Sequence, residues 1–450
     1  MRREVGPVTP ELADALADHM NIRRGEVHEV TSFYSFLQVP PDTVRVCTGP
    51  VCDSMGAAAR SGELEVACLG HCDLAPVRME GDQVVGGVTH RANGFLLEAD
   101  ELRPAPDLPP DRVLAELEAS GLTGMGGAGF PAWRKWEAVR HEPAPRVVVV
   151  NADEGEPGTI KDRYVMELRP QLLLEGLEIA MRFCETDDAY IYLREEYATA
   201  RSRLQDAIEA RGLPVRIVVG AGAYIAGEET AMLESMEGRR AMPRLRPPFP
   251  AQFGYLGRPT LINNVETLAH VALILRGGRQ AVRLWSVSGC VREPGCYEAP
   301  LDVTARQLID DYAGGASEEI GAIVPGGAAS GILPPAAIDV PLTRDALREW
   351  GAGPGSAGFQ VFPASYSPVR LLAETMRFFA EESCQKCTPC RIGNRALHHL
   401  FAGELEMSRA KLDEWLEAME KTSICGLGQA SPFPVRNVLR HWPELVEALG

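Results

Sequence analysis

The stretch GLTGMGGAGFPAWRKW, from Gly121 to Trp136, has six Gly or Ala residues among its first nine positions. Such a backbone can approach a planar or phosphorylated ligand closely, because no large side chain shields the amide N–H groups. Gly124, Gly126 and Gly129 satisfy G-x-G-x-x-G, which in dinucleotide-binding folds follows a strand and opens a helix. Here an expected helix over 111–120 precedes the glycines. The stretch alone therefore fits a tight structural turn as well as a nucleotide site.

The size and charge of the chain limit what it can be. A length of 450 residues is enough for about three domains, and the formal net charge of −17 argues against binding to nucleic acid. No apolar run is long enough for a membrane span, and the N-terminal residues lack the apolar segment of a secretory signal. We therefore expect a cytoplasmic protein with no direct membrane contact, which reaches a membrane only through partners.

Cysteine is the most informative residue type. The chain has 11 cysteines, and in a reducing compartment disulfides are not expected. Three of them, Cys184, Cys290 and Cys296, are interpreted as small buried side chains. The other eight fall into two groups: Cys47, Cys52, Cys68 and Cys72 near the N-terminus, and Cys384, Cys387, Cys390 and Cys425 near the C-terminus.

The N-terminal group lies among short strand patterns. TVRVC (43–47) and LEVAC (64–68) alternate like strands and each ends at a cysteine, and 76–86 is typical of a hairpin with Gly81-Asp82 at the turn. Two packing helices are expected before them, one capped by Thr9 and one over 24–37. The spacing C-x4-C followed by C-x3-C leaves three interpretations open: a [2Fe–2S] cluster, a zinc site, or buried thiols without metal.

Strand and helix patterns alternate in the middle of the chain. Apolar strands are expected at 146–150, 189–193 and 215–219, with helices at 168–184 and 197–211 between them. This alternation predicts a parallel sheet covered on both faces, in which ligands bind beyond the C-terminal strand ends.

Polar loops follow at those strand ends. They are NADEGEPGT (151–159), GAGAYIAGEET (220–230) and LINNVET (261–267). The first could be a solvated acidic loop, but the recurrence of glycine-rich or amide-bearing loops after strands favours a flavin site.

The C-terminal quarter has helical periodicity, with Leu372, Met376 and Phe379 on one face. Between such helices lies ESCQKCTPCR, in which three thiols have the spacing C-x2-C-x2-C. This spacing strongly indicates three ligands of a [4Fe–4S] cluster, with zinc as the alternative. Cys425 is the only cysteine downstream and is expected to be the fourth ligand.

Two known families resemble parts of this sequence. HEVTSFYSF, CTGPVC and CLGHCDLAPV resemble the thioredoxin-like [2Fe–2S] subunit of NADH dehydrogenases of the respiratory complex I type, which implies a [2Fe–2S] cluster on the N-terminal cysteines. Only 15 residues separate Cys52 from Cys68, fewer than is typical of that family, so we expect a helix to be trimmed away.

The second resemblance covers about residues 110–450. GMGGAGFP, NADEGEPGTIKDR, GAGAYIAGEETAMLESMEG, RPPFPAQFGYLGRPTLINNVETL and ESCQKCTPCRIG look like the FMN- and NADH-binding subunit of the same dehydrogenases. Similar subunits serve as diaphorases in NAD-reducing hydrogenases and in molybdenum- or tungsten-containing formate dehydrogenases.

This resemblance implies the site residues. Glu156 and Glu229 would lie by the nicotinamide and its ribose and are the expected catalytic residues. The expected cofactor-binding residues, for FMN and for NAD(H), are Gly126, Gly127, Phe130, Lys135, Asn151, Asp153, Glu154, Tyr224, Gly227, Glu228, Arg246, Phe249, Asn263 and Asn264.

Together the resemblances imply a multidomain α/β fold. The expected domains are a helical segment with a thioredoxin-like [2Fe–2S] domain (1–105), a Rossmann-like FMN/NADH-binding α/β domain (106–275), a ubiquitin-like β-grasp insert of the SLBB type (276–360) and a helical [4Fe–4S] domain (361–450). In the insert, strands are expected at 284–289 and 296–299 and a helix at 303–312.

The implied function is conversion between two-electron and one-electron transfer: NADH gives a hydride to FMN, and iron–sulfur clusters take single electrons. No molybdenum, tungsten or nickel–iron site is recognisable in the sequence, so we expect a catalytic partner subunit and other iron–sulfur subunits. The fused modules and PGGAASGILPP (325–335) favour a formate dehydrogenase assembly, with a hydrogenase or complex I as alternatives. A structural zinc-binding or redox-sensing scaffold is the hypothesis from a different class.

Overall fold

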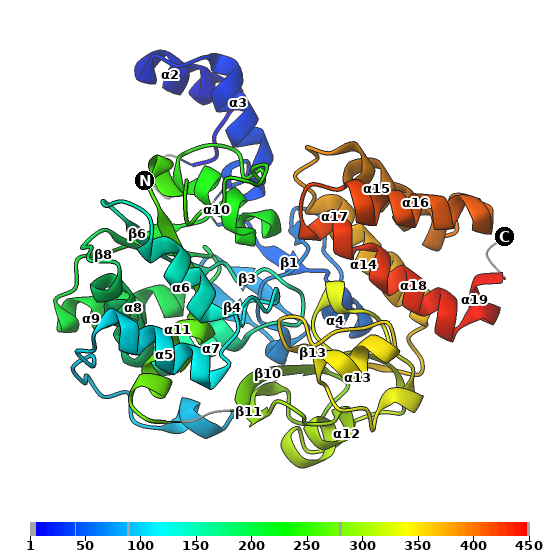
Figure 1. The fold of residues 1–450 in the computed structure, drawn as a ribbon. Helices are drawn as coiled ribbons and strands as arrows, with labels where there is room; N and C mark the ends of the chain where they lie inside the picture. The colour runs from blue at the N-terminus through cyan, green and yellow to red at the C-terminus, as the bar shows by residue number, and fades with distance from the viewer. Residues whose placement is uncertain (1–5, 41, 88–90, 279–280, 448–450) are drawn as a thin grey trace.

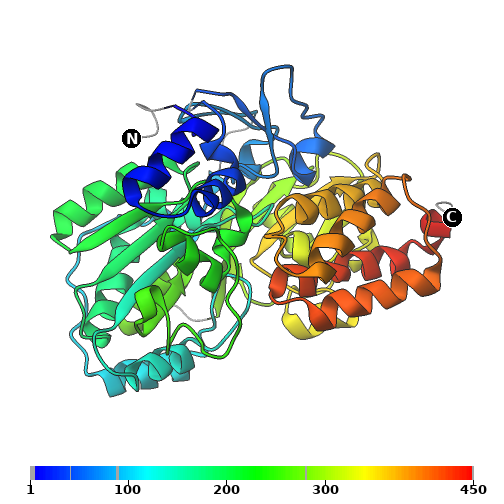
Figure 2. The ribbon, with the colours of Figure 1, turned by 90° about the horizontal axis from the view of Figure 1, so that it is seen from above.

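The structure is a computed structural model that describes residues 6–40, 42–87, 91–278 and 281–447. The first five residues of the expected N-terminal segment lie outside the described part. The fold has an α/β body, with a helical C-terminal region beside it (Figures 1 and 2). Within the described residues, no helix combines the length and the apolarity that crossing a membrane requires.

A four-stranded parallel sheet forms the centre of the α/β body. Its order is β8-β7-β6-β9, with bounds β6 Val147–Ala152, β7 Ala189–Leu193, β8 Val215–Val219 and β9 Thr260–Asn264. Val148 and Val150 enter one core while Val147 and Val149 enter another, so both faces are covered, as the sequence predicts. The strand β9 was not predicted, because the segment TLINN carries only two apolar residues.

Helices surround this sheet, and α8 packs against α11 on one face. The helix expected over 111–120 ends at Gly121, which has the left-handed φ of +66° that favours glycine. The helix α6, which the sequence analysis did not predict, begins at Ala132, so the glycine-rich stretch does open a helix. The bounds are α5 Pro110–Ser120, α6 Ala132–Arg140, α7 Lys161–Leu168, α8 Pro170–Phe183, α9 Ala198–Arg211, α10 Glu229–Met236 and α11 Val265–Leu275.

The N-terminal residues form a second, mixed sheet of order β2-β1-β3-β4. β1 pairs with β2 in parallel and with β3 antiparallel, and the predicted hairpin turns at Gly81, where φ is +62°. The helix expected over 24–37 ends at Phe33 because Tyr34 is extended, and a 3-10 turn follows over Ser35–Leu37. Figure 1 shows α2 and α3 standing out from the body. The bounds are α2 Pro10–Met20, α3 Arg24–Phe33, β1 Arg45–Cys47, α4 Pro50–Ser54, β2 Leu64–Val66, β3 Arg78–Glu80 and β4 Gln83–Val85.

The third sheet collects strands from distant parts of the chain, in the order β12-β13-β10-β11-β5. β13 runs across residue 360, so the expected boundary between the insert and the helical region falls inside a strand. β5 lies in the expected N-terminal domain yet pairs with β11. The helix expected over 303–312 is a short α-turn that continues as a π-turn over Leu308–Tyr312. The bounds are β5 Arg91–Ala92, β10 Val282–Gly289, β11 Gly295–Pro300, α12 Ala305–Gln307, β12 Ile320–Val324, α13 Arg344–Glu349 and β13 Gly358–Pro363.

The C-terminal region is helical, as predicted. Leu372, Met376 and Phe379 are fully buried and form part of its core. The bounds are α14 Pro368–Glu381, α15 Thr388–Phe401, α16 Arg409–Thr422, α17 Gly426–Ala430, α18 Pro432–His441 and α19 Pro443–Glu447.

Candidate functional site

The strand order of the parallel sheet locates a ligand-binding edge. From β6 the chain continues outward on one side to β7 and β8, and then returns to the other side of β6 as β9. In open sheets of this kind, ligands bind beyond the C-terminal strand ends at the point where the order reverses. That point lies between the ends of β6 and β9, where Asn151 and Asn264 are register partners.

The glycine-rich stretch lies over this edge. Gly124 N–H donates to the Phe130 carbonyl at 2.8 Å, which closes the stretch into a loop. Met125 N–H donates to Thr267 Oγ1 at 2.9 Å, and a methyl group at Gly126 would lie 3.4 Å from the Cβ of Asn264. The sequence left a structural turn and a nucleotide site open, and the loop lies where such a sheet binds ligands.

Two polar atoms at this edge lack a hydrogen-bond partner within the described part of the chain. They are Nδ2 of Asn263, a side chain that is only 5% exposed, and Oδ2 of Asp153. Burial raises the pKa of Asp153 to about 8. A buried donor or acceptor without a partner costs about 1–3 kcal/mol, so these two atoms are suited to a polar ligand.

Several expected flavin ligands instead use their side chains to hold the protein together. Glu154 accepts N–H bonds from Asp162 at 2.8 Å and Arg163 at 3.1 Å. Glu228 caps α10, accepting from Thr230 and Ala231 at 2.9 Å each. These carboxylates fix the loops that would surround a ligand.

Asn264 is occupied in the same way. Its Oδ1 accepts from the amides of Glu266 at 3.1 Å and Thr267 at 3.4 Å, so the side chain caps α11. Its Nδ2 donates to Asp162. Both ends of the Asn264 side-chain amide are therefore used inside the protein.

The remaining expected site residues border the same edge. Asn151 Nδ2 donates to the Gly227 carbonyl at 2.8 Å, which joins the end of β6 to the segment after β8. Lys135 on α6 forms an ion pair with Glu229 at the start of α10.

Glu156 connects the loop after β6 to the third sheet. It accepts a hydrogen bond from the Tyr224 hydroxyl and another from Ala329 N–H at 3.0 Å. Burial raises its pKa. The segment 325–335 therefore touches the site directly.

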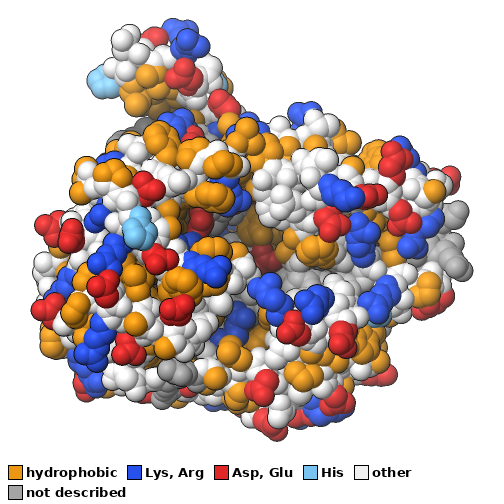
Figure 3. All heavy atoms as spheres, viewed as in Figure 1, with side chains coloured by type: hydrophobic (Ala, Val, Ile, Leu, Met, Phe, Trp, Pro, Cys, Tyr) orange, Lys and Arg blue, Asp and Glu red, His pale blue; other side chains and the backbone are white. Residues whose placement is uncertain are grey.

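The aromatic residues expected near the adenine are open to solvent. The side chains of Phe130 and Phe249 are 51% and 52% exposed, and Arg246 lies 3.8 Å from Glu228. Figure 3 shows the molecular surface hollowed between the α/β body and the helical region.

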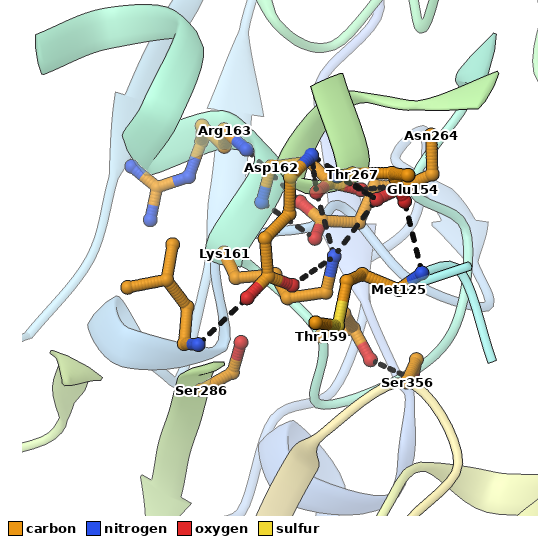
Figure 4. Close-up of polar contacts among 12 residues, drawn as sticks. Met125, Glu154, Thr159, Lys161, Asp162, Arg163, Asn264, Thr267, Ser286 and Ser356 are labelled. Carbon is orange, nitrogen blue, oxygen red and sulfur yellow. Dashed lines mark hydrogen bonds and ion pairs between the residues drawn. The ribbon is translucent and has the colours of Figure 1, made fainter. Parts of the chain in front are cut away.

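A buried network of charges beneath the glycine-rich loop was missed by sequence reasoning (Figure 4). Lys161 is fully buried and pairs with Asp162 at 2.6 Å and Glu266 at 3.1 Å. Although burial acts against ionisation, the charge of Lys161 holds the pKa of Glu266 at about 2. A charged residue in the otherwise apolar helix VETLAHVALIL was the available signal. The network fixes the starts of α7 and α11.

The N-terminal cysteines lie close together in the folded chain. Cys47, Cys52, Cys68 and Cys72 are all at least 92% buried, at the ends of β1 and β2 and in the turns that follow. Hydrogen bonds with Cys52 and Cys68 shift the pKa of Cys47, and the Cys47 thiol together with burial raises the pKa of Cys68 to about 12. The four thiols are therefore neighbours.

This group lies directly against the loop after β6. Gly158 N–H donates to Cys72 Sγ at 3.3 Å. The Arg194 guanidinium bridges the Cys68 carbonyl, at 2.7 Å, and the Glu154 carbonyl. Beside Cys72, the buried Asp73 accepts from Arg163 at 2.6 Å.

The C-terminal cysteines lie at helix starts. Cys387 precedes α15, Cys390 lies in its first turn, and Cys425 precedes α17. Burial raises the pKa of Cys390 to about 12, with further contributions from Cys387, Cys425 and Cys384. The four thiols therefore interact with one another, and Cys387 is the least buried of them.

The backbone packs closely around the C-terminal cysteines. A methyl group at Gly428 would lie 2.8 Å from the Cβ of Cys390, so only glycine fits there. Across the described residues, no three His, Cys, Asp or Glu side chains converge on a position for a single metal ion.

Comparisons with known proteins match both halves of this arrangement. Residues 117–273 match the family described as the Nuo51 FMN-binding domain. Residues 370–449 match the NADH-ubiquinone oxidoreductase-F iron–sulfur binding region.

Whole-chain relatives extend the match. The second F-type subunit of the NADH-quinone oxidoreductase of Rhizobium meliloti (strain 1021) is 40% identical over 367 residues, covering 74% of this chain and 87% of the relative. The corresponding F-type subunit of Streptomyces coelicolor is 39% identical over 380 residues, covering 77% and 84%. Among solved structures, a chain of an NAD+-reducing [NiFe]-hydrogenase in the H2-reduced state superposes with a TM-score of 0.86 and 31% identity, covering 98% of this chain and 90% of that one.

Proposed function

Since the chain belongs to the family of F-type NADH-quinone oxidoreductase subunits, we propose that it exchanges hydride between NAD(H) and FMN and passes electrons singly to iron–sulfur clusters. The chain is an NADH-binding flavoprotein subunit of the type found in NADH-quinone oxidoreductases and NAD-reducing hydrogenases. The observation that supports the residue assignment is the pair of buried polar atoms, on Asp153 after β6 and on Asn263 in β9, that have no hydrogen-bond partner in the described structure.

The residues present fit a flavin nucleotide. Asn263 Nδ2 supplies a buried donor and Asp153 Oδ2 a buried acceptor, both at the reversal point of the sheet. The amides of Gly126 and Gly127 lie in the loop above, without side chains in the way. When bound, FMN accepts two electrons as a hydride and releases them one at a time.

The protein orients the nucleotide beside this site. Phe130 and Phe249 offer exposed rings for the adenine, while Glu156 lies on the loop after β6 and Glu229 at the start of α10. The Lys135–Glu229 pair and the hydrogen bond from Tyr224 to Glu156 fix both carboxylates before a ligand arrives. Such preorganisation allows the nicotinamide to be held within hydride reach of the flavin.

We assign the two groups of cysteines to two clusters. Cys384, Cys387, Cys390 and Cys425 would hold the [4Fe–4S] cluster of the family region, and Cys47, Cys52, Cys68 and Cys72 a [2Fe–2S] cluster. The shortened spacing leaves no complete helix between Cys52 and Cys68 in the described chain, since α4 itself contains Cys52, and the four thiols still lie close together.

We further propose that the partner is the catalytic subunit of a molybdenum- or tungsten-containing formate dehydrogenase, with other iron–sulfur subunits. The support is the single-chain arrangement of both cysteine groups with the flavin domain. The similarity to a chain of an NAD+-reducing [NiFe]-hydrogenase supports a hydrogenase assembly equally well. The similarity to F-type subunits supports a quinone oxidoreductase.

Metal analysis of the complex purified from the native host separates these assemblies. Molybdenum or tungsten in stoichiometric amount supports the formate dehydrogenase assembly. Nickel assigns the chain to a hydrogenase, and the absence of all three metals assigns it to a quinone oxidoreductase.

The flavin assignment has its own test. Asn263→Leu removes the buried donor and is expected to lower FMN content about tenfold, as for loss of one strong hydrogen bond in a buried site. Asn93→Leu is the matched control, because Asn93 accepts a hydrogen bond from Glu298 in β11 of the third sheet. This variant is expected to keep its FMN. A colourless protein loaded with zinc would instead support the structural scaffold.

A further inference from the structure

The third sheet and its loops cover one side of the glycine-rich loop. A methyl group at Gly127 would lie 3.7 Å from the Ser356 amide nitrogen. At Gly129 it would lie 2.3 Å from Nη2 of Arg344, which begins α13. Gly129 also has a φ of +65°, so a side chain is disfavoured there for two reasons. The Arg344 guanidinium therefore rests against the backbone beside Phe130, an expected adenine contact.

Arg344 differs from its neighbours in having no counter-charge. Within the described residues, no carboxylate lies at ion-pair distance from its guanidinium, and the side chain is exposed. Other cations near the site are neutralised, since Lys135 pairs with Glu229 and Arg246 lies near Glu228. On α13 itself, Arg348 pairs with Asp345 at 3.2 Å.

A second guanidinium adds to the positive charge at this place. Arg283 is 92% buried, its Nε has no partner in the described structure, and its Nη2 lies 3.5 Å from the Gly355 carbonyl. Burial lowers the pKa of Arg283, the charges of Glu266 and Asp162 oppose that shift, and the charge of Arg344 adds to it. Figure 3 shows Lys and Arg side chains along the lower margin of the hollow. An anion bound here would relieve the repulsion between the two guanidiniums.

We propose that Arg344 binds a phosphate group of the dinucleotide on its adenosine side. A guanidinium offers paired N–H donors that match phosphate oxygens. The position beside Phe130 places that phosphate next to the expected adenine ring. The inference rests on the proposed function and adds to it a residue from the insert that determines dinucleotide affinity.

The test compares Arg344→Gln with Arg348→Gln in the holoenzyme. Loss of one charge-assisted contact predicts a KM for NADH about tenfold higher in Arg344→Gln, with kcat unchanged. Calorimetry with NAD+ is expected to show the same loss of affinity and a weaker dependence on salt. FMN content stays at the wild-type level in both variants, and Arg348→Gln keeps the wild-type KM.

Comparing the binding of NAD+ with that of NADP+ shows which phosphate Arg344 contacts. Equal weakening of NAD+ and NADP+ binding is expected and identifies the pyrophosphate. Weakening of NADP+ alone would overturn the inference, because NAD+ has no 2′-phosphate. Unchanged affinity for both, in a variant whose flavin is still reduced by NADH, overturns the inference but leaves the proposed function intact. Loss of FMN from Arg344→Gln also overturns it, because the arginine would then serve the flavin phosphate.

Discussion

The two cysteine groups are held in different ways. The N-terminal group is bound to the loop after β6 through the hydrogen bond from Gly158 to Cys72 and through the bridge made by Arg194. The C-terminal group is held by the starts of α15 and α17, and its Cys387 is partly exposed. The first group is thus positioned by the flavin loop itself, whereas the second is positioned by helices that bring one thiol toward the surface. This difference predicts that only the second group passes electrons outward.

The largest expected effect is the loss of a cluster when one cysteine of either group is replaced. Cys390→Ser should remove about four irons per chain and abolish electron delivery to a protein acceptor, while Cys72→Ser should remove about two irons and leave delivery intact. Iron analysis, electron paramagnetic resonance and acceptor reduction measure these outcomes. Cys184→Ser, a buried cysteine outside both groups, keeps all its iron. Equal loss of delivery in both cluster variants would contradict the division of roles.

The attachment of the N-terminal group to the flavin loop predicts a large stability effect. Asp73→Asn removes the shorter of the two ion pairs of the buried Arg163, which keeps only Glu167 at 3.4 Å, and should lower the free energy of unfolding by about 3 kcal/mol. Asp339→Asn breaks the exposed pair with Arg306 and should change it by less than about 1 kcal/mol. Anaerobic denaturant titrations compare the two. Similar small changes would show that the attachment is weak.

A smaller effect is expected at the nucleotide side of the site. Glu229→Gln weakens the ion pair with Lys135 and should raise the KM for NADH about tenfold while FMN content is retained. Steady-state kinetics and flavin quantification measure the two quantities. Neither cysteine group should lose iron. Loss of the flavin in this variant would show that Glu229 belongs to the FMN site instead.

The smallest effect concerns the contact between the helical region and the residue that follows α13. Burial lowers the pKa of His441, which stacks on Trp350, so the folded state favours the neutral ring. Its stabilising contribution is complete above the unfolded-state value near 6.5 and declines as pH falls below it. Thermal unfolding at pH 7.5 and 5.5 should show a slightly smaller acid loss in His441→Gln. An identical loss in both proteins would exclude His441 from the pH response.

The sequence predicted those strands in which nearly every residue favours a strand. β7 and β8 have the predicted bounds, because AYIYL and VRIVV are strongly strand-forming. β9 was missed because its last two residues are Asn, and β13 because the expected domain boundary was placed inside it. Strands with polar residues are stabilised by pairing with neighbouring strands in the sheet, and a single sequence does not reveal that pairing.

The candidate site could be predicted where the spacing of one residue type is distinctive. The spacing singled out both cysteine groups and the glycine-rich loop, and the ligands assigned to them stay a prediction. The capping roles of Asn264, Glu228 and Glu154 could not be predicted, because a polar side chain in a loop can bind a ligand or a helix start equally well. The buried Lys161–Glu266 pair joins residues 105 positions apart, which only the folded chain brings together.

The most direct test of the account is an anaerobic titration of the reconstituted protein with NADH. The account predicts that flavin absorption bleaches and that iron–sulfur signals of the reduced clusters appear in the same titration. A protein that contains FMN and iron yet keeps its oxidised spectrum under excess NADH would contradict the claim that this chain moves electrons from the dinucleotide through the flavin to its clusters.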